Sequence, residues 1–150
     1  MSYTRLLYHI VFRPKNSRPA ITPEHEELLY RYIWRVLTER GCKLFCIGGM
    51  ADHIHMLVGI PPTLAVADFM RDVKTCTSRF MHIHSAEFPL FEAWGKSYCA
   101  ISCSESVRED VTRYIKNQKE HHRRQDFRSE FLDILRKNGV EFDMKYFLKE

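Results

Sequence analysis

The run from Asp52 to Val58 constrains the fold of this chain more than any other stretch, because apolar and polar residues alternate along it. Alternation with a period of two is typical of an extended strand, whose successive side chains point to opposite faces of a sheet. His53 and His55 therefore share one face. The residues of the opposite face are apolar and are expected to meet a hydrophobic core: Ile54, Met56 and Val58.

Other stretches carry equally plain strand and helix patterns. The predicted strands, which are apolar runs bounded by turn-forming residues, span residues 3–13, 43–47, 52–60 and 97–103. A first helix is predicted from Thr22 as N-cap, with Pro23 at its first helical position, to Gly41 at its C-terminal stop. A second helix is predicted over 64–85. The pair Gly48-Gly49 predicts the turn between the two central strands.

Strand, helix, strand, strand, helix, strand is the element order of the ferredoxin-like fold. In that α+β, RRM-like arrangement both helices pack on one face of an antiparallel sheet, and the other face stays open with His53 and His55 on it. The 150 residues, of which 45% are hydrophobic, are typical of a single domain over residues 1–150. Residues 140–150 show no clear pattern.

Helical periodicity resumes after the last predicted strand. Ser106 and Glu109 have the spacing of a capping box, which would begin a third helix. Tyr114 and Gln118 are four positions apart and so lie on one side of that helix. The helix could bring both side chains to the histidine pair, where a metal ion and a phosphodiester would meet. A short final helix is predicted over 127–137.

Composition argues against a membrane span and against a disulfide framework. The longest apolar runs are far shorter than the roughly 20 residues that a membrane span needs, and no signal-peptide pattern is evident, so a cytoplasmic protein without membrane contact is expected. The five cysteines are odd in number and lack a CxxC motif. Both CxxxC pairs lie in predicted strands, where such positions are about 13 Å apart. Reduced thiols are therefore expected.

The net charge of +4 is too small to indicate nucleic-acid binding by itself, but the charge is distributed unevenly. Five basic residues and one acidic residue lie between positions 113 and 124, and a second basic group at 13–18 contains no acid. Such groups are either solvated surface or contacts for a phosphate backbone. The candidates for DNA contact are Arg13, Lys15, Arg18, Arg113, Lys116, Lys119, Arg123 and Arg124.

Two further histidine pairs need separate interpretations. His82 and His84 repeat the spacing of the strand pair, but residues two apart on a helix point about 200° apart, so this pair is expected on the surface. His121 and His122 follow Tyr114 by seven and eight positions, on the same side if the helix continues. They are expected to contact DNA phosphates or to cap the end of the helix.

Taken together, four stretches match the pattern of a known family. They are Tyr8-His9-Ile10-Val11-Phe12, residues 52–58, Ser97-Tyr98 and residues 114–122. With these stretches the chain resembles the small single-tyrosine transposases of bacterial insertion sequences, members of the HUH superfamily, which is named for two histidines that flank a hydrophobic residue. The resemblance implies a homodimer in which each active site takes its tyrosine helix from one subunit and its histidines from the other.

The resemblance also implies roles for individual residues. His53 and His55 match the metal-binding pair, Gln118 matches the third metal ligand, and Tyr114 matches the nucleophile. The implied activity is nicking and rejoining of single-stranded DNA at the ends of an insertion sequence, at sites chosen by nearby hairpins.

These residue types suit that chemistry. A phosphodiester is already anionic, so a cation on its non-bridging oxygens makes the phosphorus accessible and stabilises the developing charge. Two imidazoles and one amide oxygen leave open coordination positions and suit Mn²⁺ or Mg²⁺. A tyrosine nucleophile leaves a covalent 5′-phosphotyrosine, so a DNA 3′-hydroxyl can later rejoin the strands without ATP.

Three alternatives remain at this point. A zinc site made by His53, His55 and His122 would suit hydrolysis by bound water. A ferredoxin-like module of the RNA-recognition type would bind single-stranded nucleic acid without catalysis. A domesticated relative would cut repeats without moving an element.

Overall fold

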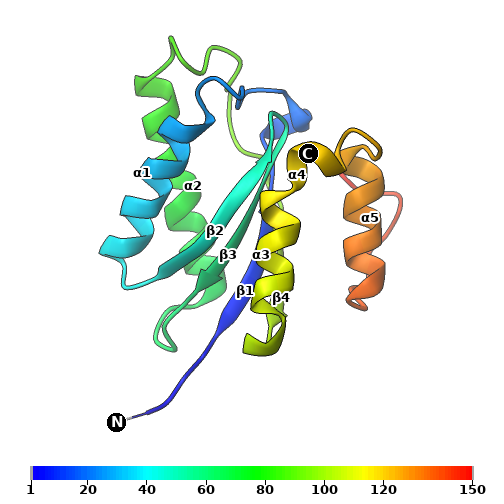
Figure 1. The fold of residues 1–150 in the computed structure, drawn as a ribbon. Coiled ribbons are helices and arrows are strands. Elements are labelled where there is room, and N and C mark those ends of the chain that lie inside the picture. The colour runs from blue at the N-terminus through cyan, green and yellow to red at the C-terminus, as the bar shows by residue number, and fades with distance from the viewer. Residues whose placement is uncertain (1, 150) are drawn as a thin grey trace.

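The computed structural model describes residues 2–149 and contains one four-stranded antiparallel sheet. In the order β2-β3-β1-β4, its strands are β2 (Lys43–Met50), β3 (His53–Gly59), β1 (Leu7–Phe12) and β4 (Cys99–Cys103). The helices α1 (Glu26–Glu39) and α2 (Val66–Ile83) lie together on one face of the sheet (Figure 1). The predicted ferredoxin-like α+β fold is confirmed.

The apolar alternation of β3 places the main core. Ile54, Met56 and Val58 are fully buried in one cluster with the inward faces of α1 and α2. Strand β1 contributes Ile10 and Phe12, which pair with Met56 and Ile54 respectively in the antiparallel register. The first face of the sheet is therefore apolar throughout its contact with the two long helices.

The second face of the sheet is covered, which corrects the prediction that it stays open. Three shorter helices lie across it: α3 (Arg108–Lys116), α4 (Gln118–His121) and α5 (Phe127–Lys137) (Figure 1). Helix α5 packs Phe127 and Leu135 against Val11 of β1 and Cys99 of β4. This packing buries the histidine face, and His53 and His55 are both 0% exposed.

The pair Gly48-Gly49 lies inside β2, so the predicted turn at these residues is wrong. The chain turns instead at residues 51–52. A Cβ added to Gly48 would lie 2.7 Å from the Ile115 carbonyl oxygen of α3, and one added to Gly49 would overlap the His53 carbonyl oxygen. The glycines therefore permit the close approach of neighbouring backbone, which is the other common use of glycine.

Two predicted helix starts are also wrong. Helix α1 begins at Glu26, because Thr22 accepts backbone hydrogen bonds from His25 and Glu26 in a turn that precedes the helix. The capping box of Ser106 does not form, because residues 105–107 make the short 3₁₀ helix η2 (Glu105–Val107) and α3 starts without a side-chain cap. A second 3₁₀ turn, η1 (Lys15–Ser17), follows β1.

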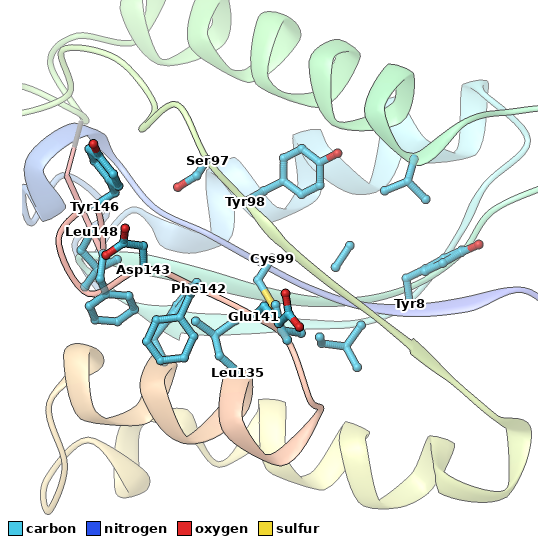
Figure 2. A pocket seen from close by; sticks show the side chains of 16 residues that line it. Tyr8, Ser97, Tyr98, Cys99, Leu135, Glu141, Phe142, Asp143, Tyr146 and Leu148 are labelled. Carbon is cyan, nitrogen blue, oxygen red and sulfur yellow. The ribbon is translucent and has the colours of Figure 1, made fainter.

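The final helix, α5, spans the predicted residues 127–137. Asp126 caps α5 by accepting a hydrogen bond from the Ser129 amide, and Gly139 follows the helix with φ of 66°. Residues 140–149 form neither helix nor strand, and they pack Phe142 and Phe147 against α5. Between this tail and the edge of β4 lies a cavity of about 640 Å³, lined by Tyr98 among others and by no histidine (Figure 2).

The remaining predictions about surface and thiols agree with the structure. All five cysteines are free. His82 is exposed and His84 is half-buried at the end of α2, and neither belongs to the possible metal cluster found in residues 2–149. No helix in the described part of the chain is both long and apolar enough to cross a membrane.

Candidate active site

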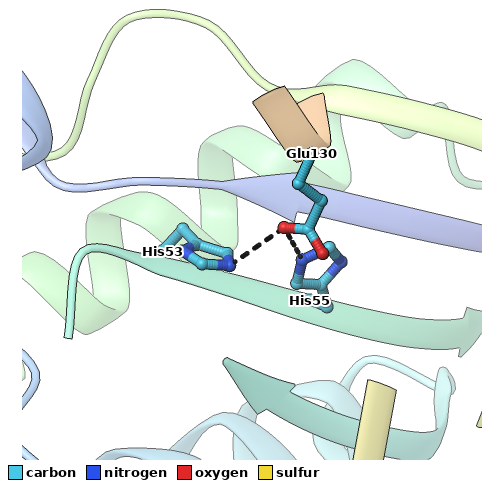
Figure 3. A group of neighbouring side chains, drawn as sticks. All are labelled: His53, His55 and Glu130. Carbon is cyan, nitrogen blue, oxygen red and sulfur yellow. Dashed lines mark hydrogen bonds and ion pairs between the residues drawn. The ribbon is translucent and has the colours of Figure 1, made fainter. Parts of the chain in front are cut away.

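Strand β3 delivers His53 and His55 side by side on the covered face of the sheet. Their ring centroids are 5.1 Å apart. The Nε2 atoms of His53 and His55 lie 3.3 Å and 3.1 Å from the same carboxylate oxygen, Oε1 of Glu130 (Figure 3). As the alternation of the strand predicted, both imidazoles lie on one face of the sheet, and both approach the same carboxylate oxygen.

The other nitrogen of each imidazole has its own partner. His53 Nδ1 lies 2.7 Å from Oδ1 of Asp52, and His55 Nδ1 lies 2.8 Å from Nε2 of His9 on β1. A hydrogen bond at Nδ1 fixes the ring orientation and leaves Nε2 available to an acceptor or a metal, the arrangement usual around metal-binding histidines. The neighbours on β1 and at the start of β3 thus orient the pair.

Tyr114 and Gln118 reach the same point from across the covered face. The Tyr114 ring lies 5.7 Å from the His55 ring, and Gln118 Oε1 lies 3.0 Å from His53 Nε2. The predicted single helix is interrupted between them at Asn117, which has φ of −95° and ψ of 15°, so Tyr114 is on α3 and Gln118 begins α4. All four predicted site residues meet within one chain. Exchange of the tyrosine helix between subunits is not needed to assemble them and stays a prediction.

Glu130 is the site residue that sequence reasoning missed. This carboxylate on α5 is 1% exposed. Its Oε1 lies near His53, His55 and, at 2.9 Å, His122 Nε2, while its Oε2 accepts hydrogen bonds from the Tyr114 hydroxyl and, at 2.8 Å, from Gln118 Nε2. The sequence did contain a signal, because Glu130 interrupts the apolar stripe of a predicted helix, as Gln118 does.

Burial and charge shift the pKa of each titratable group in the cluster. Burial, with a smaller contribution from the neighbouring His53 and His122, outweighs the effect of Glu130 and lowers the pKa of His55 to about 4. Burial and the neighbouring His55 lower the pKa of His9 to about 3. Burial also opposes the charged form of His53, but hydrogen bonds to Asp52 and Glu130 outweigh it and raise the pKa of His53 to about 9. The site therefore holds His55 as a neutral imidazole at pH 7.

The nucleophile candidate and the carboxylate shift in opposite directions. Burial and the hydrogen bond to the anionic Glu130 raise the pKa of Tyr114. Burial would raise the pKa of Glu130, but hydrogen bonds from His122, His53 and His55 outweigh it and hold this pKa well below its usual range. In this state Tyr114 is a protonated phenol beside an ionised carboxylate.

The basic candidates divide into two groups. Arg13 is 4% exposed and donates to Ser17 Oγ and the Leu148 carbonyl, so it faces the protein rather than solvent. His121 and His122 point toward Glu130, although His121 keeps 32% of its side chain exposed, and their contact with phosphate stays a prediction. The other candidates are exposed or half-exposed: Lys15, Arg18, Arg113, Lys116, Lys119, Arg123 and Arg124.

A cavity of about 350 Å³ opens beside the cluster. Tyr114, His9 and Glu130 form part of its wall, together with His121 and the outer residues of α5. The phenol is half-buried. A ligand in this cavity could therefore touch both the tyrosine and the Glu130 carboxylate.

The donor atoms of the cluster fit a divalent metal ion. His53, His55 and Glu130 each offer one ligand atom, and these atoms lie within 4.8 Å of one another. Two imidazoles and one carboxylate are a usual set for divalent transition metals. Gln118 Oε1 is close enough to His53 to add an amide oxygen.

Comparison with known proteins gives a consistent match. The family model "Transposase IS200 like" matches residues 2–118. The ISDra2 transposase TnpA of Deinococcus radiodurans is 25% identical over 121 residues, which are 76% of this chain and 84% of that protein. The transposase for insertion sequence element IS200 of Salmonella typhimurium is 28% identical over 117 residues, which are 75% of this chain and 76% of that protein.

Solved structures agree with the fold. A crystal structure from Deinococcus radiodurans matches with a TM-score of 0.63 and 26% identity, covering 78% of this chain and 93% of that one. The structure of a REP-associated tyrosine transposase bound to a REP hairpin matches with a TM-score of 0.61 and 14% identity, covering 81% of this chain and 72% of that one. The second likeness shows the fold alone.

Proposed function

Because the chain belongs to the IS200-like transposase family, we propose that it nicks and rejoins single-stranded DNA at insertion-sequence ends through a 5′-phosphotyrosine. The observation that supports this most is the convergence of Tyr114 with His53, His55 and Gln118 beside a cavity. A nucleophile and a set of metal ligands from separate elements are what phosphoryl transfer to tyrosine requires.

His53, His55 and Gln118 would hold the cation, and Mn²⁺ or Mg²⁺ suits this donor set. When bound, such an ion withdraws electron density from the non-bridging oxygens of the phosphodiester and stabilises the charge that develops there. Asp52 and His9 support the ligands from behind, because they fix the two imidazole orientations.

Tyr114 supplies the covalent step. Its hydroxyl oxygen forms a bond to phosphorus while the bond from phosphorus to the DNA 3′-oxygen breaks. The phenol proton leaves beside Glu130 Oε2, which accepts a hydrogen bond from this hydroxyl, and passes through water to the departing 3′-oxygen. The products are a 5′-phosphotyrosine and a free 3′-hydroxyl. Attack by a 3′-hydroxyl on the phosphotyrosine reverses these bond changes and rejoins DNA.

The proposed partners are single-stranded DNA that carries hairpins and a second copy of the chain. Support for a hairpin comes from the structural neighbour, which is bound to a REP hairpin. Exposed basic residues near the tyrosine helix, including Lys116 and Arg124, are proposed backbone contacts. A homodimer with shared active sites is proposed from the family resemblance, although one chain contains every group of the site.

Covalent capture tests this function directly. The protein is incubated with Mn²⁺ and labelled single-stranded DNA from the flanks of its gene, and adducts are resolved on a denaturing gel. We expect an adduct with the unmodified protein, none with Tyr114→Phe, and none in EDTA. Tyr146→Phe, which changes a 64% exposed tyrosine, is the matched control and should form the adduct normally. An undiminished adduct in Tyr114→Phe would end the assignment.

The zinc-dependent nuclease is kept as a second candidate because of one observation. His122 Nε2 lies 2.9 Å from Glu130 Oε1, the oxygen that also faces His53 and His55, so a third imidazole is within reach of the site. Stoichiometric zinc in the purified protein, with cleavage but no covalent adduct, would favour this candidate. The binding-only module is less favoured, because α3, α4 and α5 cover the sheet face that it would use.

A further inference from the structure

We propose that Glu130 of α5 is a fourth protein ligand of the cation, bound through Oε1, while its Oε2 holds the Tyr114 hydroxyl next to the metal. The proposal rests on the cation of the proposed function and adds a residue to its site. It makes α5, which follows the residues 2–118 matched by the family model, part of the active site.

The two carboxylate oxygens face different groups. Oε1 lies on the histidine side, 3.3 Å from His53 Nε2 and 3.1 Å from His55 Nε2. Oε2 lies on the tyrosine side, where it accepts from the Tyr114 hydroxyl. One oxygen can therefore bind a metal while the other keeps the nucleophile in place, without a change of helix position.

Charge gives an independent reason for a carboxylate here. Two neutral imidazoles and an amide leave the full +2 charge of a cation uncompensated in a buried site, and burying net charge is costly. Glu130, 1% exposed, reduces the net charge to +1. The single negative charge of a phosphodiester then brings the loaded site to neutrality. Without Glu130 the site would keep a positive charge even with DNA bound.

Helix α5 holds the carboxylate firmly. Asp126 caps the helix through the Ser129 amide at 2.9 Å, one turn before Glu130. Phe127 stacks on the His53 ring with a centroid distance of 4.3 Å, so α5 and the metal-binding strand pack directly. A ligand fixed on a packed helix loses little conformational freedom when it binds a metal.

A purely structural Glu130 makes the opposite prediction. If the carboxylate only neutralises the histidine cluster, it competes with a cation for the same Nε2 atoms, and removing its charge should tighten metal binding. If it is a ligand, removing its charge should weaken metal binding. The sign of the change in Mn²⁺ affinity therefore separates the two roles.

The experiment is titration calorimetry of the full chain with Mn²⁺, in the absence of DNA. Changes in the outer shell of a metal site typically weaken affinity about 10–100-fold, so loss of a ligand in Glu130→Gln should raise the Kd at least about tenfold. Glu27→Gln removes an exposed carboxylate from α1 on the other face of the sheet, where Glu27 pairs with Arg31 at 3.4 Å, and should leave the Kd unchanged. Equal or tighter binding by Glu130→Gln overturns the proposal, as does a lack of Mn²⁺ binding by the unmodified protein.

A second variant covers the case in which Glu130→Gln does not fold, which circular dichroism would reveal. Glu130→Asp keeps the carboxylate but shortens its reach, so a ligand role predicts weaker binding and a competitor role predicts equal or tighter binding. Because no DNA is present, the outcome is independent of covalent capture. Weakened Mn²⁺ binding in the variant with no adduct in the unmodified protein would reject only the proposed function.

Discussion

The two faces of β3 are equally buried and chemically opposite. Ile54 and Met56 point into the apolar core under α1 and α2, and both are 0% exposed. His53 and His55, their neighbours along the strand, are also 0% exposed but point into a network of imidazoles, an amide and a carboxylate under α3, α4 and α5. One short strand thus contributes side chains to an apolar core on one face and to a buried polar network on the other.

The comparison shows which interior stabilises the fold and which serves chemistry. Each aliphatic side chain that is fully buried contributes about 1.5–3 kcal/mol to the free energy of folding. The first face therefore stabilises the fold without needing hydrogen-bond partners. Buried polar groups only recover their desolvation cost when they are hydrogen-bonded. One exception to this rule is the buried Nε2 atom of His121, which has no hydrogen-bond partner among the described residues. The polar network of the second face therefore adds less to stability than the apolar core does, and this network is the candidate for metal and phosphate chemistry.

The largest expected effect comes from substituting two adjacent residues of β3 that point to opposite faces, His55 and Met56. His55→Ala should reduce Mn²⁺-dependent adduct formation more than about 100-fold, because it removes a proposed metal ligand and ligands matter at least as much as their supporting shell. Met56→Ala should lower the free energy of unfolding by about 2–5 kcal/mol through the cavity it leaves. Adduct yield per folded molecule and urea unfolding, measured on both variants, check the pair.

Each variant acts as the control for the other. His55→Ala should change the free energy of unfolding less than Met56→Ala does, and Met56→Ala should keep most of its adduct yield at low temperature, where it remains folded. If Met56→Ala lost activity as completely as His55→Ala while folded, the division of labour between the faces would be wrong.

A smaller effect is expected where α3 packs against β2 on the second face of the sheet. Gly48→Ala would place a Cβ 2.7 Å from the Ile115 carbonyl oxygen, so α3 must move outward and take Tyr114 with it. We expect a loss of about 1–3 kcal/mol in the free energy of unfolding, as for other overpacked sites, together with a lower adduct yield.

Gly59→Ala is the matched control for this variant. Its added Cβ would meet the side chain of Phe45 at 3.3 Å rather than a backbone atom, and a side chain can yield. Equal losses of stability in the two variants would show that the close approach of α3 to β2 does not depend on Gly48.

Local pattern predicted the fold because it acts within each element. The alternation of β3, the helical period of α2 and the span of α5 depend on residues close together in the sequence, and the structure confirms them. Gly48-Gly49 misled because glycine serves both turns and close backbone approach, and only the position of α3 separates these uses. The covered second face depends on packing among distant elements, which a local pattern does not encode.

The site was predictable only in part for the same reason. His53, His55, Tyr114 and Gln118 follow from the family motifs, and the structure brings their side chains together within one chain, while their roles stay predictions. Glu130 lies 12 positions beyond Gln118, and its contact with the histidines exists only because α5 folds back over β1 and β4. A carboxylate inside an apolar stripe was the available clue, and it identifies a buried polar group without naming its partners.

The two faces should also differ in their response to pH, since only the second titrates. In the folded protein the pKa values of His9 and His55 are about 3 and about 4, below the pKa of 6.5 expected in the unfolded chain. The unfolded chain therefore binds more protons below pH 6.5, and stability falls as the pH drops. His53, with a pKa of about 9, gains stability below 6.5 that is lost as pH rises through 9. Melting temperatures in EDTA should therefore peak near pH 6.5.

Asp52→Asn sharpens this prediction. It removes the carboxylate that helps to raise the pKa of His53, so the loss of stability between pH 6.5 and 9 should become shallower while the acidic side is unchanged. The melting temperature measured by circular dichroism across this range checks both limbs. A wild-type curve that is flat from pH 5 to 9 would contradict the assignment of the histidine charges.

The smallest effect concerns how the second face recruits DNA from outside. Lys116 is exposed in the last turn of α3, two residues beyond Tyr114, whereas Lys15 lies 3.5 Å from Glu92, which already compensates its charge. Each phosphate contact contributes about 0.7 to the slope of log K against log salt for single strands. Lys116→Ala should lower that slope by about this amount and Lys15→Ala by less. Filter binding at several salt concentrations measures both, and a larger change for Lys15→Ala would place the DNA path along η1 instead of beside the tyrosine helix.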